Sequence, residues 1–164
     1  MKNLFIIRHA KSSWEKEGLH DIERPLAGRG ESDAALMGKM LLKKGTVPQI
    51  VISSPALRAF STARIICDEI NFDKNKIAIN NVLYFGDEDA IIELIRSFLT
   101  EIETAVIVGH NPTFSHLCSA LCENFHSDLP TCGIVTLAFN TGSWKLIEKH
   151  SGKLVSCDYP KNYR

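Results

Sequence analysis

Three short runs of apolar residues punctuate the chain, and each is followed at once by polar or turn-forming residues. They occupy positions 4–7, 50–52 and 105–108. A short apolar run bounded by polar residues is typical of a strand that is buried on both faces of a parallel or mixed sheet. The pattern therefore predicts three buried strands, each of which ends in a polar loop.

Between these strands, apolar residues recur three and four positions apart, which is the spacing of one buried helix face. This spacing predicts helices over residues 31–44, after Ser53-Ser54-Pro55, over residues 87–99 and after residue 112. Gly45 is expected to end the first helix, because glycine readily adopts the left-handed conformation found after many helices. We expect serine to cap the second helix, with Pro55 at its first position, and Asp87 to cap the third.

The other segments carry weaker signals. Residues 133–139 and 144–148 are predicted to pair as antiparallel strands around a turn at residues 140–143. We expect a short strand over residues 77–83, an edge strand over residues 154–157, a frayed tail over residues 158–164 and a long ordered loop over residues 10–30. The alternation of strands and helices predicts an α/β sandwich, and the length suits a single domain over residues 1–164.

Composition and charge narrow the possible partners and the compartment. Nineteen Lys and Arg balance nineteen Asp and Glu, so no overall field favours nucleic acid or an anionic membrane. No apolar run approaches the ~20 residues of a membrane span, and the N-terminal run is too short for a signal-peptide core. The five cysteines are odd in number and irregularly spaced, which favours reduced thiols. We therefore expect a cytoplasmic protein.

Each predicted buried strand is followed by a candidate ligand for an anion. Arg8 and His9 come after the first strand, Arg58 after the second and His110 after the third. If the strands are parallel neighbours, their carboxyl ends meet at one edge of the sheet, where ligands bind in open α/β folds. Guanidinium groups match phosphate oxygens bidentately, and a helix N-terminus adds further donors. With no acidic residue expected beside them, these groups predict a strongly positive pocket for a phosphoryl group.

The motifs around these residues resemble those of the histidine phosphatase superfamily, and within it the small SixA-type phosphohistidine phosphatases. The resemblance covers residues 1 to about 115 and is carried by the following motifs in order: Arg8-His9-Ala10-Lys11-Ser12-Ser13-Trp14, Asp21 with Arg24-Pro25-Leu26, Arg29-Gly30, Ser53-Ser54-Pro55 with Arg58 and Thr62-Ala63, and Gly109-His110-Asn111-Pro112. It implies a three-layer α/β/α sandwich with a mostly parallel central sheet.

The same resemblance implies roles for individual residues. His9 would be the nucleophile, and Arg8, Arg58 and His110 would hold the phosphoryl oxygens, with no metal or cofactor. A nucleophilic imidazole must be neutral, with one nitrogen held by an acceptor such as a backbone carbonyl. The two arginines are expected to lower the pKa of His9 and keep it neutral.

Three further residues are candidates for substrate binding at the rim of the pocket. Asp21 and Arg24 match a position that supports this rim in the family, although a simple surface ion pair between them is an equal alternative. Ser12 could donate a hydrogen bond to phosphate from the loop, but ordinary loop polarity explains it as well.

The chain departs from the larger superfamily at two places. Ala10 stands where glycine is usual, an alanine common in the SixA-like branch. Residues 83–89 lack a counterpart of the general-acid glutamate of the phosphoglycerate mutases, and Asp87, Glu88 and Asp89 are predicted to cap a helix instead. A leaving imidazole, with a pKa of about 6.5, needs an acid far less than an alkoxide whose hydroxyl has a pKa near 15.7.

These observations predict a phosphatase that dephosphorylates phosphohistidine on a partner protein, such as a histidine-containing phosphotransfer domain. One alternative is a phosphatase of small phosphorylated metabolites, and another is a non-catalytic phosphate-binding signalling module. A phosphotransfer mutase is the least favoured. A zinc site at His116, Cys118 and Cys122 is a separate alternative to buried, inert thiols, but the spacing matches no established ligand pattern.

Overall fold

A computed structural model describes residues 1–164 and contains a six-stranded sheet in the order β3-β2-β4-β1-β5-β6. The strands are β1 (Lys2–Arg8), β2 (Ile50–Ser53), β3 (Ala78–Ile79), β4 (Thr104–Gly109), β5 (Ile134–Phe139) and β6 (Lys153–Asp158). Strands β3, β2, β4 and β1 run parallel, whereas β5 is antiparallel to both β1 and β6. The three strands predicted from the apolar runs therefore lie side by side at the centre.

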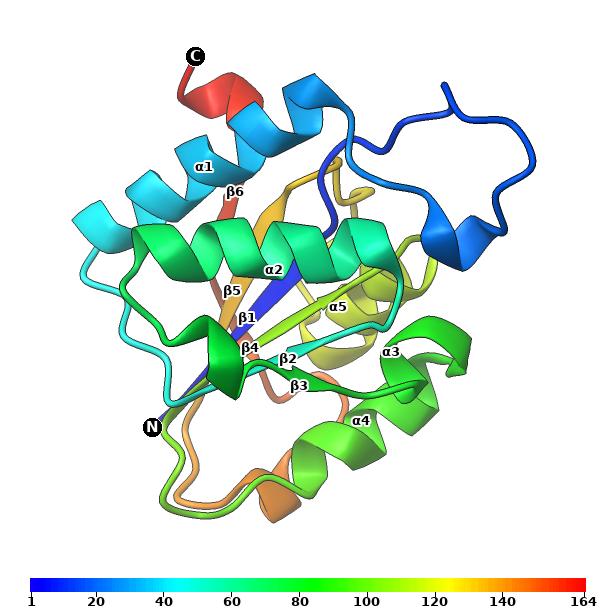
Figure 1. Cartoon of the computed structure of the whole chain (residues 1–164). Coiled ribbons are helices and arrows are strands. Elements are labelled where there is room, and N and C mark those ends of the chain that lie inside the picture. Colours follow the sequence, from blue (N-terminus) through cyan, green and yellow to red (C-terminus); the bar gives the residue numbers. More distant parts are fainter.

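Helices cover both faces of the sheet, as Figure 1 shows. Helices α1 (Gly28–Lys43) and α2 (Leu57–Glu69) pack together on one face. The opposite face carries α3 (Val82–Phe85), α4 (Glu88–Arg96) and α5 (Thr113–Leu121). Short 3-10 helices complete the chain: η1 (Asp21–Glu23), η2 (Lys74–Lys76), η3 (Trp144–Leu146) and η4 (Pro160–Asn162). The predicted α/β sandwich is thus confirmed, with three layers.

Side chains that alternate along the central strands supply two separate cores. In β4, Ala105 and Ile107 face the core under α4 and α5, whereas Val106 and Val108 face the core under α1 and α2. All four are essentially inaccessible to solvent. A strand buried on both faces has no polar position in its interior, which is why these strands are continuous apolar runs.

The helix boundaries follow from local capping. Gly45 follows α1 with φ of 77°, in the left-handed conformation expected there. The carboxylate of Asp87 accepts a hydrogen bond from the backbone N–H of Ala90 at 2.9 Å, so Asp87 caps α4 as predicted.

One predicted strand is wrong, and another is shorter than predicted. Residues 144–148 do not pair with β5: they begin with η3, because Trp144 turns inward, is fully buried and donates from Nε1 to the carbonyl of Ile102 at 2.7 Å. The antiparallel partner of β5 is β6, which includes the predicted edge strand at residues 154–157. Residues 77–83 contribute only Ala78 and Ile79 to the sheet before the chain turns into α3.

The C-terminal tail is also more ordered than predicted. Residues 160–162 form η4, and the guanidinium of Arg164 binds both carboxylate oxygens of the buried Asp33 on α1, at 2.8 and 2.9 Å. Figure 1 shows the C-terminus beside α1. A buried carboxylate requires a partner, and the tail supplies it.

None of the helices combines the length and apolar character needed to cross a membrane.

The carboxyl ends of β2, β4 and β1 meet at one edge of the sheet. Arg8 pairs with Gly109 in the parallel register of β1 and β4, and Ser53 pairs with Val108 in that of β2 and β4. The residues that follow these strands are therefore close in space. A long loop over residues 9–27 leaves β1 at this edge and projects from the body of the protein (Figure 1).

Candidate active site

His9 is held rigidly at the end of β1. Its backbone N–H donates to the carbonyl of Gly109 at 3.0 Å, and its carbonyl accepts from the N–H of Cys132 at 3.0 Å. The imidazole Nδ1 lies 2.7 Å from the carbonyl oxygen of Ala10. Since a carbonyl only accepts, Nδ1 carries the proton and the lone pair resides on Nε2. His9 is 8% exposed, and this geometry prepares Nε2 as a nucleophile.

The surroundings keep this imidazole neutral. Burial is the largest cause that lowers the pKa of His9, and the guanidinium groups of Arg58, Arg8 and Arg24 add to it, against the opposing effect of the Ala10 carbonyl; together they bring the pKa to about 4. The arginines therefore act as predicted, but removal from water is the larger cause. At neutral pH the lone pair on Nε2 is free for chemistry.

His110 stands opposite His9 after β4. The two ring centroids are 5.1 Å apart. Nε2 of His110 lies 2.7 Å from the hydroxyl of Ser54, which also accepts a hydrogen bond from the backbone N–H of Ala56 at 3.1 Å. Burial and the nearby His9 lower the pKa of His110 to about 3, so this ring is neutral as well. Its Nδ1 is buried and makes no hydrogen bond within the protein.

Arg8 is anchored by a backbone carbonyl on the far side of the site. Its Nη1 donates to the carbonyl of Leu129 at 2.9 Å. The same oxygen accepts from the side-chain amide of Asn111, also at 2.9 Å. The amide oxygen of Asn111 in turn accepts from the hydroxyl of Ser115, which itself accepts from the N–H of Leu129. This closed network fixes the Arg8 guanidinium from the segment between α5 and β5.

Arg58 is oriented by Asp21, which reaches it from η1. Arg58 Nη1 donates to the Asp21 carbonyl at 2.7 Å, and Nη2 donates to Oδ2 of the Asp21 carboxylate at 2.9 Å. The hydroxyl of Tyr84 donates to the same carboxylate oxygen at 2.6 Å. The hydrogen bond from Tyr84 and those from Arg58 and Arg24 hold the pKa of Asp21 far below its usual range. Asp21 is therefore ionised at any physiological pH.

Arg24 and Ser12 contact each other inside the loop that follows β1. Both side chains are buried, and Arg24 Nη2 donates to the Ser12 hydroxyl. Nη1 of Arg24 donates to the Asp21 carboxylate at 3.1 Å, while the guanidinium carbon lies 3.3 Å from the centre of the Trp14 ring. This stacking pins the loop with a cation–π contact. Trp14 itself remains 74% exposed.

Two residues link the loop after β1 to the helices behind it. The hydroxyl of Thr62 accepts from the backbone N–H of Ala10 at 3.0 Å and donates to the carbonyl of Arg58 at 2.7 Å. Gly30 packs against the backbone of Lys11 so closely that a Cβ there would lie 2.1 Å from the Lys11 carbonyl oxygen. The loop that follows His9 is thus fixed to α2 by a hydrogen bond and to α1 by close packing.

Comparisons with known proteins place this chain in a family. The model for the histidine phosphatase superfamily (branch 1) matches residues 4–80, which contain Arg8, His9 and Arg58. An uncharacterized protein of Mycobacterium leprae is 30% identical over 167 aligned residues, which span 94% of this chain and 100% of the relative. This chain belongs to the histidine phosphatase superfamily. An uncharacterized chloroplastic protein of Arabidopsis thaliana is 29% identical over 88% of the chain and 69% of its own length.

Solved structures show the same superfamily fold. The SixA protein of Agrobacterium tumefaciens matches with a TM-score of 0.82 at 24% identity, over 97% of this chain and 98% of that one. The protein histidine phosphatase SixA in complex with tungstate matches with a TM-score of 0.83 at 22% identity, over 99% of both chains. The three-layer architecture expected from the sequence motifs is confirmed.

The structure brings together the seven candidate site residues that the sequence indicates, namely Arg8, His9, Ser12, Asp21, Arg24, Arg58 and His110. Asp21 and Arg24 form the ion pair considered above and also bind the site residues. The expectation of no acidic neighbour is wrong, because the loop folds back over α2 and carries the Asp21 carboxylate to Arg58. Three guanidinium groups against the Asp21 carboxylate and the Asp128 carboxylate near Arg8 still leave the site positive.

Sequence reasoning missed residues that position the others, namely Ser54, Thr62, Tyr84 and Asn111. Ser54, Thr62 and Asn111 lie within the quoted motifs, which is a signal for their importance, but the motifs did not indicate their positioning roles. Pro55 does not occupy the first helical position: α2 begins at Leu57 with Ala56 before it, and Ser54 instead spans the approach to the helix and His110. Of the alternative zinc residues, His116 is exposed whereas Cys118 and Cys122 are buried in the core.

Proposed function

We propose that this protein is a metal-independent phosphatase that hydrolyses phosphohistidine on a partner protein through a phosphorylated His9. The observation that carries the proposal is the His9 imidazole, whose Nδ1 is fixed on the Ala10 carbonyl while Nε2 faces a site of two arginines and a neutral His110. In the first step, Nε2 attacks phosphorus and the bond from phosphorus to the substrate imidazole breaks. In the second, water attacks the phosphorylated His9 and releases inorganic phosphate, which restores the free imidazole.

The charge distribution supports positioning and electrostatic stabilisation as the source of rate. Arg8 and Arg58 provide guanidinium groups for the equatorial phosphoryl oxygens, and neutral His110 can donate a further hydrogen bond from Nδ1 when the Ser54 hydroxyl donates to its Nε2. Each of these groups is anchored by protein partners before any substrate binds, so little reorganisation is needed. The matched SixA structure contains tungstate, a tetrahedral oxyanion, which agrees with a phosphoryl site on this fold.

The state of Asp21 supports a phosphorus–nitrogen bond as the target. Asp21 is the carboxylate that contacts the site, and its hydrogen bonds to Tyr84 and two arginines keep it ionised. An ionised carboxylate cannot protonate a leaving group. An alkoxide leaving group would need such a proton, whereas a phosphorylated imidazole whose other ring nitrogen is protonated leaves as neutral imidazole, with a conjugate-acid pKa of about 6.5. The site therefore suits phosphohistidine better than alkyl phosphates.

A substrate panel tests this proposal. Wild type, His9→Ala and the control His116→Ala, which changes an exposed histidine on α5, are assayed on a phosphotransfer domain phosphorylated on histidine, on a phosphotyrosine peptide and on 3-phosphoglycerate. We expect wild type and His116→Ala to dephosphorylate the phosphohistidine protein fastest, and His9→Ala to be inactive on every substrate. Faster turnover of 3-phosphoglycerate would contradict the substrate assignment, and phosphate binding without turnover of any compound would favour a non-catalytic module.

A further inference from the structure

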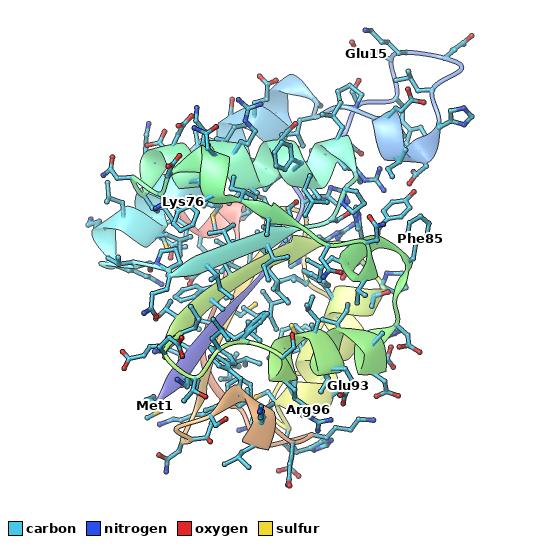
Figure 2. The ribbon with its side chains drawn as sticks, turned by 60° about the horizontal axis from the view of Figure 1, so that its bottom comes forward. Met1, Glu15, Lys76, Phe85, Glu93 and Arg96 are labelled. Atoms are coloured by element: carbon cyan, nitrogen blue, oxygen red, sulfur yellow. The ribbon has the colours of Figure 1, made fainter.

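Exposed apolar side chains gather around the carboxyl-end edge of the sheet. Twelve large apolar residues are exposed in the whole chain, and five of them lie on segments that surround the active site: Trp14, Leu19, Leu57, Ile79 and Phe85. In Figure 2, Phe85 lies on the outer side of α3, and Glu15 marks the tip of the loop that follows β1. Scattered single apolar residues are ordinary on a protein surface, but a concentration beside a catalytic pocket indicates an interaction site.

Part of this surface is a groove of about 490 Å³ between the loop, the start of α2 and the edge strand β3. We call it the η1–α2 groove, and its lining includes Lys16, Ile22, Glu23, Leu57 and Ile79. Leu57 is 42% exposed and Ile79 is 55% exposed, so both offer apolar surface to a ligand. The charged members, Lys16 and Glu23, have opposite signs and cancel.

The η1–α2 groove is lined by residues that are direct neighbours of site residues along the chain or in the sheet. Ile22 follows Asp21 in η1, and Leu57 precedes Arg58 in α2. Ile79 pairs in register with Ser53 at the carboxyl end of β2, one residue before Ser54, which contacts His110. A molecule whose phosphoryl group reaches His9 therefore presents its neighbouring parts to this groove.

We infer that the η1–α2 groove receives apolar side chains of the phosphoprotein substrate, next to its phosphohistidine. This inference rests on the proposed function and adds a docking surface to it. The phosphoryl group is held in the charged pocket, so a substrate no larger than a metabolite leaves an apolar groove of this size unused. A folded protein that carries apolar side chains beside its phosphohistidine fills both, and burial of exposed leucine and isoleucine supplies binding energy that the charged pocket does not.

The test separates docking from chemistry by comparing two substrates with the same scissile bond. The double variant Leu57→Gln/Ile79→Thr keeps a helix-forming residue in α2 and a β-branched residue in β3 while removing the apolar surface. The matched control, Leu146→Gln/Val155→Thr, changes two other exposed apolar residues that lie outside the groove. Each protein is assayed on a phosphotransfer domain phosphorylated on histidine and on free phosphohistidine, with KM and kcat determined separately.

We expect kcat/KM of the groove variant to fall about 10-fold on the phosphoprotein through a higher KM, with turnover of free phosphohistidine unchanged and the control like wild type on both. Equal turnover by groove variant and wild type on the phosphoprotein would overturn the inference. An equal loss of kcat/KM on both substrates would also overturn it, because it would show that the two residues have a structural role. Self-association of wild type that the groove variant loses would overturn it as well, because the groove would then bind a second copy of the chain. If wild type itself does not dephosphorylate the phosphoprotein, the proposed function is refuted, whatever the groove variant does.

Discussion

Thr62 offers a sharp test of how the nucleophile is positioned. Its side chain is fully buried, and its hydroxyl joins the backbone N–H of Ala10 to the carbonyl of Arg58. Replacement by valine preserves shape and volume but leaves the buried Ala10 N–H without an acceptor. An unsatisfied buried donor costs about 1–3 kcal/mol. For a chain of this length, the melting temperature should fall by about 2–4 °C per kcal/mol.

The same substitution should also reduce catalysis, because Ala10 supplies the carbonyl that orients the His9 imidazole. A misplacement of about 1 Å in a catalytic group can cost ~100-fold in rate, so we expect kcat to fall about 10- to 100-fold. Urea denaturation and steady-state kinetics with p-nitrophenyl phosphate measure the two effects.

The matched control for Thr62→Val is Thr136→Val, a buried threonine in β5 that lies outside the site. Its hydroxyl holds no catalytic backbone group, so its substitution should leave activity unchanged. If Thr62→Val were as stable and as active as this control, the Thr62 hydroxyl would not hold the loop that carries His9 and Ala10.

Three further predictions concern single residues of the site. The imidazole of His9 should titrate in ¹H NMR near pH 4. Because a histidine in the unfolded chain titrates near 6.5, the free energy of unfolding that His9 contributes should be lost as the pH falls from about 6.5 to about 4. A midpoint near 6.5 in the folded protein would contradict this. Gly30→Ala should lower the free energy of unfolding by about 1–3 kcal/mol, because the added Cβ meets the Lys11 carbonyl. The control Gly28→Ala should not destabilise the protein, because the space around position 28 is open. Equal melting temperatures of the two variants would disprove the packing argument. In the phosphatase assay, Arg58→Ala should reduce kcat about 100- to 1,000-fold, as the loss of one oxyanion donor does. A change in KM with kcat unaltered would exclude a role for Arg58 in stabilising the transition state.

The central strands could be predicted because burial on both faces leaves an unmistakable apolar run, as in residues 105–108. The pairing of the C-terminal strands could not, because the apolar pattern predicts residues 144–148 as the partner of β5. The segment that begins at Trp144 contains as many apolar residues as a strand, but the indole fills a space beneath α4 and bonds to the Ile102 carbonyl. Such a partner is distant in sequence, and periodicity alone carries no information about it.

The site shows the same division. Arg8 ends β1, His9 and His110 follow strands, and Arg58 lies in the first turn of α2, so topology alone brings them to one edge. The groups that orient them are a backbone carbonyl at Leu129, a tyrosine on the short helix α3 and a loop carboxylate at Asp21. These depend on how loops fold over the sheet, which the pattern of apolar residues does not encode.

The anchor of Arg8 has a consequence for how this protein tolerates change. Because the acceptor is the main-chain oxygen of Leu129, shared with Asn111, alanine scanning cannot delete it. Every amino acid at position 129 still presents a carbonyl. A change in the length of the connection between α5 and β5, by contrast, would move that oxygen beyond hydrogen-bond distance of the Arg8 guanidinium. A one-residue insertion there should therefore disable the enzyme while every catalytic side chain stays intact.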